Sequence, residues 1–306
     1  MKTIIAAILL SMMLAISAYA ESIELDVAFK KTSSYLEKHK LALTGGVGGA
    51  RDDLAAFAQE TLMFYGEAVG NPKHDASGQR GTMAKRAAVV TAQRALAEYL
   101  EGFLLVGVTL VKDGMAENDI IISTVSALVK GSQVVAQEYN AETNTAIAVI
   151  KLGLRGPKGF ASSFYQKMNT DPKIRAAVKT DKPAFIALEV KLDTTFDGLI
   201  IDATEQNFRP ALINRIFAAK GDILYDPAKI SQKILVEQGC GEYTNSVDKA
   251  KAALASRGVK NALIIKASGA TNPADLQVTD DDAVKIYSAN QKGSFMAAAK
   301  VAFVLK

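Results

Sequence analysis

The sequence is poor in the residues that build metal and redox sites. Its 306 residues include two histidines, His39 and His74, one cysteine, Cys240, and no tryptophan. A Cys₂His₂ or Cys₄ zinc site, a CxxC redox pair and an intramolecular disulfide are therefore excluded for this chain alone. We interpret Cys240 as a small buried side chain, with an intermolecular disulfide as the alternative.

An excess of charge of one sign is also absent. The 36 Lys and Arg residues nearly balance the 32 Asp and Glu residues, which leaves a net charge of +4 and no basic run. Lys85, Arg86 and Arg94 lack the interleaved aromatic residues of a nucleic-acid surface, so we interpret them as a solvated helix face. The sequence therefore predicts no nucleic-acid partner.

The first twenty residues have the three parts of a secretory signal. Lys2 precedes an apolar stretch from Ile4 to Ile16, and Ala18-Tyr19-Ala20 gives the pattern that signal peptidase requires. The stretch is shorter than the ~20 residues of a spanning helix, so we predict a cleaved signal peptide, with an uncleaved anchor as the alternative. No cysteine lies near the cleavage point, which excludes lipid attachment there. We expect a mature chain without a transmembrane segment, in the periplasm or associated with the outer membrane.

The length fits two domains at ~100–200 residues each. The order of predicted helices and strands indicates an α/β (α+β) fold class, with two small mixed-sheet domains and packed helices after the signal peptide. The predicted divisions are a signal peptide at 1–20, a helical N-terminal segment at 21–75, an α/β domain at 76–154, a connecting segment at 155–183 and a second α/β domain at 184–306.

Hydrophobic periodicity predicts the individual elements. The strongest helix signal lies at 82–103, where Ala84, Ala88, Ala92 and Ala95 form one stripe. Further helices are predicted at 22–40, 51–65, 118–130, 161–168, 227–237, 246–257 and 279–287. Strands are predicted at 104–111, 133–139, 145–152, 184–192, 198–203, 211–218, 223–225, 262–267 and 295–305, and the apolar run 262–267 is typical of a buried strand.

Two loop motifs contain residues that could bind a ligand. The cluster Gly45–Gly49 precedes a predicted helix, but its spacing does not match a dinucleotide fingerprint and no strand is predicted before it. We interpret it as a flexible joint. His74-Asp75 has the chemistry of a general base or a single metal ligand, although an exposed loop histidine without a role is the favoured interpretation.

Two groups of acidic residues could bind a metal ion or form a catalytic pair. Asp280-Asp281-Asp282 follows Thr279, a good N-cap, so we interpret the three carboxylates as the first turn of a helix rather than a metal cluster. Asp193, Asp197, Asp202 and Glu205 surround a predicted strand, and we interpret them as solvated strand ends. The alternative is a carboxylate pair for glycoside hydrolysis. We therefore predict no catalytic residue, no cofactor-binding residue, no metal ligand and no cofactor.

Two stretches of the sequence resemble a known family. The run from Met83 to Val111, MAKRAAVVTAQRALAEYLEGFLLVGVTLV, resembles the alanine-rich helix and following strand of the Lpp-twenty lipoprotein family. Residues Ile122 to Leu154 are similar to the second helix and final hairpin of that domain. The family includes flagellum-associated envelope proteins, among them outer-membrane protein P and the N-terminal part of assembly protein T of the flagellar H ring. Its lipobox cysteine is absent here, and the resemblance brings no catalytic residues with it.

Other motifs resemble a longer architecture found in exported bacterial proteins. TFDGLIIDATEQNFRPAL, which starts at Thr195, is similar to a segment that follows the same domain in those proteins, as are ALIIKASGA and VTDDDAVKI. The resemblance implies a non-enzymatic envelope protein that is structural or assists assembly near the outer membrane, in its most specific form at the flagellum. Expected partners are envelope or flagellar proteins and further copies of this chain. The alternative is a periplasmic hydrolase or small-ligand-binding protein that uses Asp193–Glu205 and the loop at His74.

Overall fold

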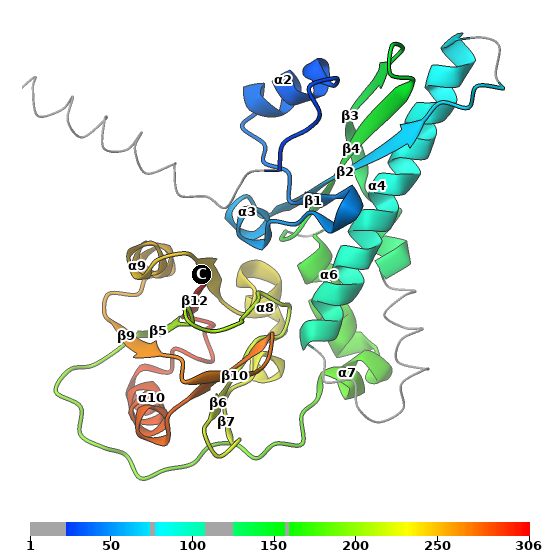
Figure 1. Ribbon diagram of the computed structural model, residues 1–306. Coiled ribbons are helices and arrows are strands. Elements are labelled where there is room, and N and C mark those ends of the chain that lie inside the picture. Colours follow the sequence, from blue (N-terminus) through cyan, green and yellow to red (C-terminus); the bar gives the residue numbers. More distant parts are fainter. Residues whose placement is uncertain (1–22, 74–76, 108–124, 157–158) are drawn as a thin grey trace, which may run out of the picture.

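The computed structural model describes residues 23–73, 77–107, 125–156 and 159–306. The predicted signal peptide and His74-Asp75 lie outside the described residues, as do residues 108–111 of one predicted strand and 118–124 of one predicted helix. Figure 1 shows an N-terminal half built around the long helix α4 and a C-terminal half built on two further sheets. The mixture of helices with mixed and parallel sheets confirms the predicted α/β fold class.

The N-terminal half is a four-stranded sheet with a long helix on one face, and on the other face Leu36 of α2 (Lys30–Lys38) packs with Met63 and Val149. Its strand order is β1-β2-β4-β3, formed by β1 (Gly45–Gly46), β2 (Thr61–Val69), β3 (Gln133–Asn140) and β4 (Thr145–Gly153). The helix α4 (Ser77–Gly107) buries its alanine stripe against β2 and β4. A Cβ at Gly66 of β2 would overlap the backbone nitrogen of Ala92 and the carbonyl oxygen of Ala88. The small residues therefore permit the close approach of helix and sheet.

Predictions for this half had mixed outcomes. The helix at 82–103 and the hairpin of β3 and β4 are confirmed, and α2 (Lys30–Lys38) occupies part of the helix expected at 22–40. The helix at 51–65 is wrong after α3 (Asp53–Ala58), because the next residues form β2 and pair along its full length with β4. The strand at 104–111 is wrong for residues 104–107, which continue α4.

The glycine cluster is a packed part of this half, so its interpretation as a flexible joint is wrong. Gly45 and Gly46 pair with β2, and a Cβ on either would overlap the ring of Phe64 or Tyr65. Gly48 and Gly49 continue into a short 3₁₀ turn with φ of 76° and 78°, a backbone region that glycine adopts readily. The glycines let the chain pass beneath two aromatic rings and turn toward α3.

Segment 155–183, predicted as a connection, contains two helices, α6 (Phe160–Thr170) and α7 (Pro172–Val178). The helix expected at 161–168 is thereby confirmed. Phe160, Phe164 and Tyr165 are buried in a hydrophobic cluster that contains Leu62 and Phe64 of one half and Ile213 and Phe303 of the other. The two halves therefore share apolar core through α6.

The C-terminal half contains two more sheets. The parallel sheet has the order β8-β12-β5-β9, formed by β5 (Gly198–Asp202), β8 (Glu242–Thr244), β9 (Ala262–Lys266) and β12 (Val301–Val304). The mixed sheet has the order β10-β11-β6-β7, formed by β6 (Arg215–Ala218), β7 (Ile223–Tyr225), β10 (Gly269–Asn272) and β11 (Asp275–Val278). The helices of this half are α8 (Gln232–Gln238), α9 (Val247–Ser256) and α10 (Asp280–Gly293).

Most helices and strands of the C-terminal half were correctly predicted from local sequence patterns. Strands β5, β6, β7 and β9 and helices α8, α9 and α10 all fall within or largely within predicted ranges, and only the last part of 295–305 forms a strand, β12. The expectation that 262–267 is a buried strand is wrong in one respect, because β9 lies at a sheet edge and Ile264 is 43% exposed. The strand at 184–192 is wrong beyond a single bridge between Ala184 and Ile223, and β10 and β11 were not predicted.

Within the described ranges, the helices are too short or too polar to cross a membrane.

Candidate functional site

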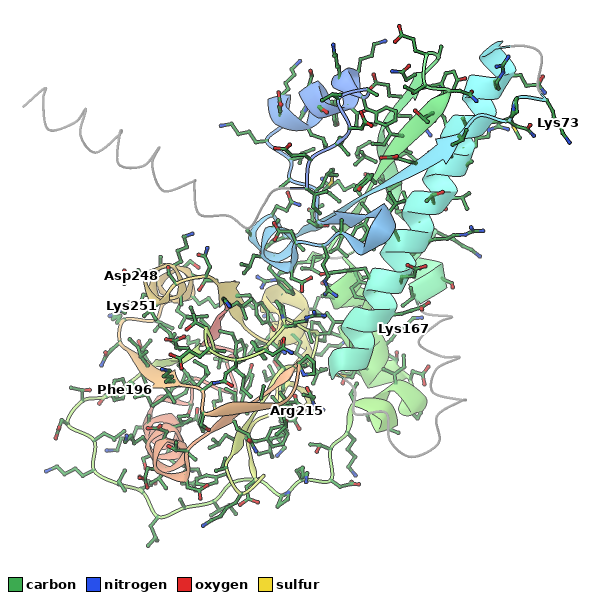
Figure 2. All side chains as sticks on the ribbon, in the orientation of Figure 1. Lys73, Lys167, Phe196, Arg215, Asp248 and Lys251 are labelled. Atoms are coloured by element: carbon green, nitrogen blue, oxygen red, sulfur yellow. The ribbon has the colours of Figure 1, made fainter. Side chains whose placement is uncertain are left out.

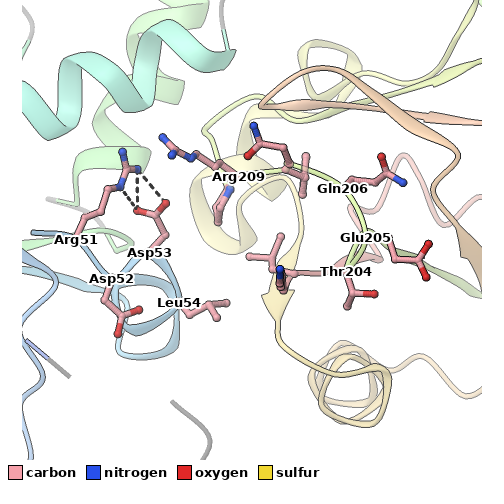
Figure 3. A pocket seen from close by; sticks show the side chains of 13 residues that line it. Arg51, Asp52, Asp53, Leu54, Thr204, Glu205, Gln206 and Arg209 are labelled. Carbon is pink, nitrogen blue, oxygen red and sulfur yellow. Dashed lines mark hydrogen bonds and ion pairs between the residues drawn. The ribbon is translucent and has the colours of Figure 1, made fainter. Parts of the chain in front are cut away.

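A cleft of about 740 Å³ lies between the two halves of the molecule. Arg51, Asp52, Asp53 and Leu54 form one wall, and residues 204–210 with Leu305 and Lys306 form the other (Figure 3). The second wall follows directly after β5 and β12, two neighbouring parallel strands. Open α/β sheets bind ligands outside the carboxyl ends of their strands, and this cleft has that position.

The charged side chains of the first wall already have hydrogen-bond partners within the protein. Asp52 caps α3 by accepting a hydrogen bond of 2.8 Å from the backbone N–H of Ala55. Asp53 accepts two hydrogen bonds of 2.9 Å from Nη2 of Arg51 and one of 2.9 Å from the hydroxyl of Tyr99. The Arg51 guanidinium also lies 5.0 Å from the centre of the Tyr99 ring. Burial and the nearby Asp53 carboxylate raise the pKa of Tyr99 well above its usual value, so its hydroxyl stays a donor.

The second wall presents a cation. Arg209 is exposed, and its guanidinium forms no ion pair or hydrogen bond with the part of the chain that the structure describes. Figure 3 shows this side chain extending from its loop toward the pair of Arg51 and Asp53. Buried Asn214 holds the loop, since its Nδ2 donates to the carbonyl oxygens of Arg209 at 3.2 Å and Ala274 at 2.7 Å. The cleft therefore offers an anchored guanidinium to a ligand.

The acidic residues singled out in the sequence are not brought together. Asp197 precedes β5 and Asp202 ends it, so at ~3.3 Å per residue their Cα atoms lie about 16 Å apart, too far for a glycosidase pair. Glu205 forms an ion pair of 2.6 Å with Lys266, and Asp193 is exposed.

Local contacts account for Asp197 and Asp202. Slight burial acts to raise the pKa of Asp197, but hydrogen bonds from the backbone N–H groups of Asn261 and Lys260 outweigh it and hold that pKa below its usual value. Asp202 accepts hydrogen bonds from the backbone and hydroxyl of Thr204. Both carboxylates thus stabilise the two ends of β5.

The remaining candidates have local roles. His39 lies at the end of α2, with Nδ1 2.8 Å from the carbonyl oxygen of Tyr35. Thr279 caps α10 by accepting from the backbone N–H of Asp282, which confirms the helix-capping interpretation of Asp280–Asp282. Cys240 is a buried free thiol 3.2 Å from the hydroxyl of Tyr243, which confirms its predicted burial. The described residues contain no cluster of three His, Cys, Asp or Glu side chains placed to hold a metal.

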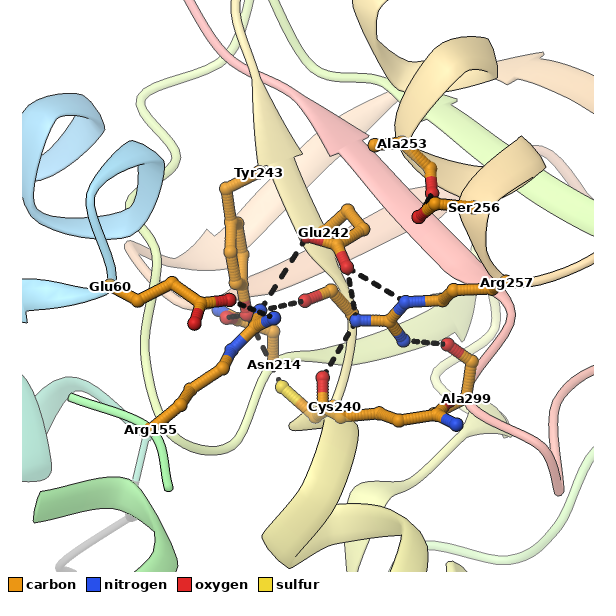
Figure 4. Close-up of polar contacts among 12 residues, drawn as sticks. Glu60, Arg155, Asn214, Cys240, Glu242, Tyr243, Ala253, Ser256, Arg257 and Ala299 are labelled. Atoms are coloured by element: carbon orange, nitrogen blue, oxygen red, sulfur yellow. Dashed lines mark hydrogen bonds and ion pairs between the residues drawn. The ribbon is translucent and has the colours of Figure 1, made fainter. Parts of the chain in front are cut away.

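Sequence reasoning missed an ionic network that joins the two halves (Figure 4). Nη1 of Arg155 lies 3.1 Å from Oε1 of Glu60, and its Nη2 lies 3.6 Å from Oε2 of Glu242. Glu242 also accepts from Nε of Arg257 at 2.7 Å, and Arg257 donates to the carbonyl oxygens of Ala299 and Gln238. Burial acts to lower the pKa of Arg155, but Glu242 and Glu60 outweigh it and raise that pKa. No local motif marks these residues, which come from four separate parts of the chain.

Residues 184–192, here called the 184–192 segment, form an unusual surface feature. The backbone N–H of Phe185 donates to the carbonyl oxygen of Ile223 at 2.9 Å, so the segment begins beside β7. It then runs around the outside of the C-terminal half without further strand pairing (Figure 1). The side chains of Ile186, Leu188 and Val190 are 79%, 91% and 41% exposed. Three apolar side chains at alternate positions thus face solvent.

Comparison with known proteins gives one similarity. Residues 198–306 match the model of a family described as Treponema pallidum Tp0624, second domain. The matched region begins at the first residue of β5 and contains both C-terminal sheets and the second wall of the cleft. The chain is therefore similar to that domain over its C-terminal part, and the 184–192 segment lies just outside the match. No curated protein matches the chain.

Proposed function

We propose that this chain is a non-enzymatic exported protein of the bacterial envelope, a structural or assembly component associated with the outer membrane. The 184–192 segment carries this proposal. Its exposed apolar side chains alternate as in a strand, yet beyond Ala184 no strand of the described residues covers it. Exposed strand-like segments are places where another protein adds a strand by main-chain hydrogen bonds, with alternate side chains giving specificity.

Sequence resemblance supports the envelope setting. The leader at 1–20 favours export, and the Lpp-twenty-like run from Met83 to Val111 favours an envelope location. The similarity of residues 198–306 to a Treponema pallidum domain is in keeping with a bacterial protein. A role at the flagellum is the most specific form of the proposal, and it rests on the Lpp-twenty resemblance alone.

Capture from intact envelopes tests the proposal. The full chain carries a C-terminal tag, cells are cross-linked before lysis, and the captured material is compared with that of Leu188→Asp. Leu188 is 91% exposed, so this substitution removes the apolar surface without disturbing the core. Val27→Asp is the matched control, because Val27 is 84% exposed on a different part of the surface.

The proposal expects specific cross-linked species that disappear with Leu188→Asp and persist with Val27→Asp. Equal recovery from all three proteins would contradict it. Deletion of the gene should impair motility if the role is flagellar. Normal motility of the deletion strain would refute a flagellar role, but it would not contradict the wider role in the envelope.

The cleft favours a second candidate function, a small-ligand-binding protein of the periplasm. The exposed guanidinium of Arg209 carries this alternative, because arginine pairs bidentately with carboxylate and phosphate groups. Titration calorimetry with inorganic phosphate should give heat with the wild-type protein and with Lys229→Gln, but not with Arg209→Gln. Absence of heat with the wild-type protein argues against a phosphate ligand. A hydrolase is less favoured, because Asp197 and Asp202 lie at opposite ends of β5.

A further inference from the structure

Two arginines face each other across the cleft between the halves. Arg51 lines the first wall and Arg209 the second, and Figure 3 shows the two guanidinium groups pointing toward one another. Nε and Nη2 of Arg51 donate to Asp53, whereas its Nη1 has no acceptor among the described residues. The guanidinium of Arg209 is likewise unpaired within that part of the chain. Unused donors of both arginines therefore open into the same space.

The backbone holds both arginines in place. Arg51 forms an antiparallel bridge with Gly45 in the N-terminal half. In the C-terminal half, the N–H of Arg209 donates to the carbonyl oxygen of Pro273 at 2.6 Å, and its own carbonyl oxygen accepts from buried Asn214 at 3.2 Å. A ligand that bound here would not have to order either wall, which lowers the entropic cost of binding.

The carboxylate side chains that line the cleft already have partners. Asp52 caps α3, Asp53 is paired with Arg51, and Glu205 forms an ion pair of 2.6 Å with Lys266. Arg209 is thus the charged side chain of the two facing guanidinium groups that no carboxylate balances. A negatively charged group of a ligand would complete the arrangement.

Two guanidinium groups on opposite walls favour a phosphoryl group over a carboxylate. A carboxylate has two oxygens, and a bidentate pair with one guanidinium uses both. A phosphoryl group offers three acceptor oxygens, so it can pair with one guanidinium and still accept hydrogen bonds from a second one on its other side.

The rest of the cleft limits what the phosphoryl group is attached to. A volume of about 740 Å³ lies within the ~300–1,000 Å³ of small-molecule sites, which leaves room for an organic group beside the phosphate. Phe208 is the only aromatic residue among the described lining residues, and it is 8% exposed and packs against Phe303, so no ring is presented to a nucleobase. Gln206 and Asn207 instead line the cleft with amide groups, which donate to and accept from hydroxyl groups.

We infer that the cleft binds a phosphorylated sugar or polyol, whose phosphoryl group lies between Arg51 and Arg209. This inference rests on the second candidate function, ligand binding in the cleft, and names the class of ligand. Because the two arginines belong to different halves, the bound ligand joins the halves and stabilises the folded chain.

Titration calorimetry of the purified full chain tests the inference with two matched sugars. Glucose 6-phosphate carries a phosphoryl group, and glucuronate carries a carboxylate on the same kind of ring. Glucose 6-phosphate should bind at least about tenfold more tightly than glucuronate and should raise the urea midpoint. Arg51→Gln and Arg209→Gln should each weaken its binding at least about tenfold.

Controls on each half separate the site from overall charge. Lys73→Gln and Lys251→Gln each remove one positive charge at an exposed position that does not line the cleft (Figure 2), and should leave binding unchanged. Circular dichroism checks that each variant is folded, and Arg209→Gln leaves the pair of Arg51 and Asp53 in place. A phosphorylated polyol can also be a lipid headgroup, so sedimentation with phosphatidylglycerol vesicles is measured as well. Sedimentation that Arg209→Gln abolishes would identify a lipid as the source of the phosphoryl group, and its absence beside binding of glucose 6-phosphate would identify a free phosphate ester.

The failures of the two proposals can be distinguished. Equal affinity for the two sugars, lost with Arg209→Gln, would overturn the phosphoryl group and leave ligand binding in the cleft standing. Binding of glucose 6-phosphate that Arg51→Gln leaves unchanged would also overturn the inference, because the first wall would then take no part. Heat with inorganic phosphate but none with glucose 6-phosphate, and no sedimentation with vesicles, would overturn the sugar or polyol. Absence of binding to all of these probes would contradict the second candidate function together with the inference.

Discussion

Replacing Glu242 by glutamine is expected to lower the free energy of unfolding, because it removes the ion pairs of Glu242 with Arg155 and Arg257. The Glu242 side chain is 21% exposed, and it lies between two largely buried guanidinium groups, those of Arg155 and Arg257. Breaking a buried ion pair by removing one partner costs ~3–5 kcal/mol, because the other charge stays buried. Arg155 retains Glu60, and Arg257 retains the carbonyl oxygens of Ala299 and Gln238, so we expect about 2–3 kcal/mol.

Urea unfolding followed by circular dichroism measures this loss as a lower midpoint. Glu205→Gln is the matched control, because it removes the same charge from an ion pair whose side chains are 66% and 59% exposed. Water screens such a pair, so the midpoint of this control should not move. If Glu242→Gln also left the midpoint unchanged, the network would not hold the halves together and the reasoning would be refuted.

Three further predictions concern stability. Gly66→Ala should cost about 3 kcal/mol in urea unfolding, because its Cβ would overlap the backbone of α4, whereas Gly78→Ala has open space and should be neutral or stabilising. Thr279→Ala should lower the free energy of unfolding by about 1 kcal/mol through loss of the α10 cap, and rescue by Thr279→Ser would tie the loss to the hydroxyl. Burial raises the pKa of Asp275 despite hydrogen bonds from Asn272 and Arg215. The folded state therefore binds this proton more tightly than the unfolded chain, and stability should fall as the pH rises from about 4 through the raised pKa. Asp275→Asn should remove that fall in urea midpoints measured across pH.

The elements that were correctly predicted are those whose signals are local. The alanine stripe of α4, the cap of α10 and the polar turn between β3 and β4 each lie within one stretch of sequence. The strand β2 was missed because its apolar residues also fit a helical spacing, and only its pairing with β4 decides between the two. The 184–192 segment shows the reverse case, since its alternation is that of a strand but the fold supplies no sheet for it beyond Ala184.

The site depends on contacts that local sequence does not encode. The cleft joins residues 51–54 to a loop that starts at Thr204, and Glu60 meets Arg155 across 95 positions of sequence. Sequence analysis identified Asp202 and Glu205 as candidate carboxylates, and both lie near the cleft. It did not predict that Arg209 would lie there with them. Arg209 was not predicted as a site residue because a single arginine has no distinctive sequence pattern. Only the fold shows which charged groups surround it.

Cross-linking at position 190 in intact cells tests the central claim, contact between proteins through the 184–192 segment, most directly. Val190 is 41% exposed within this segment, so a cysteine at this position is open to a thiol-directed cross-linker. The native Cys240 is buried and gives little background. With a thiol-directed cross-linker, Val190→Cys should therefore give specific cross-linked species, whereas Val69→Cys, at a position 71% exposed on β2, should give none. Absence of cross-linked species with Val190→Cys, or the same species with both variants, would contradict the account.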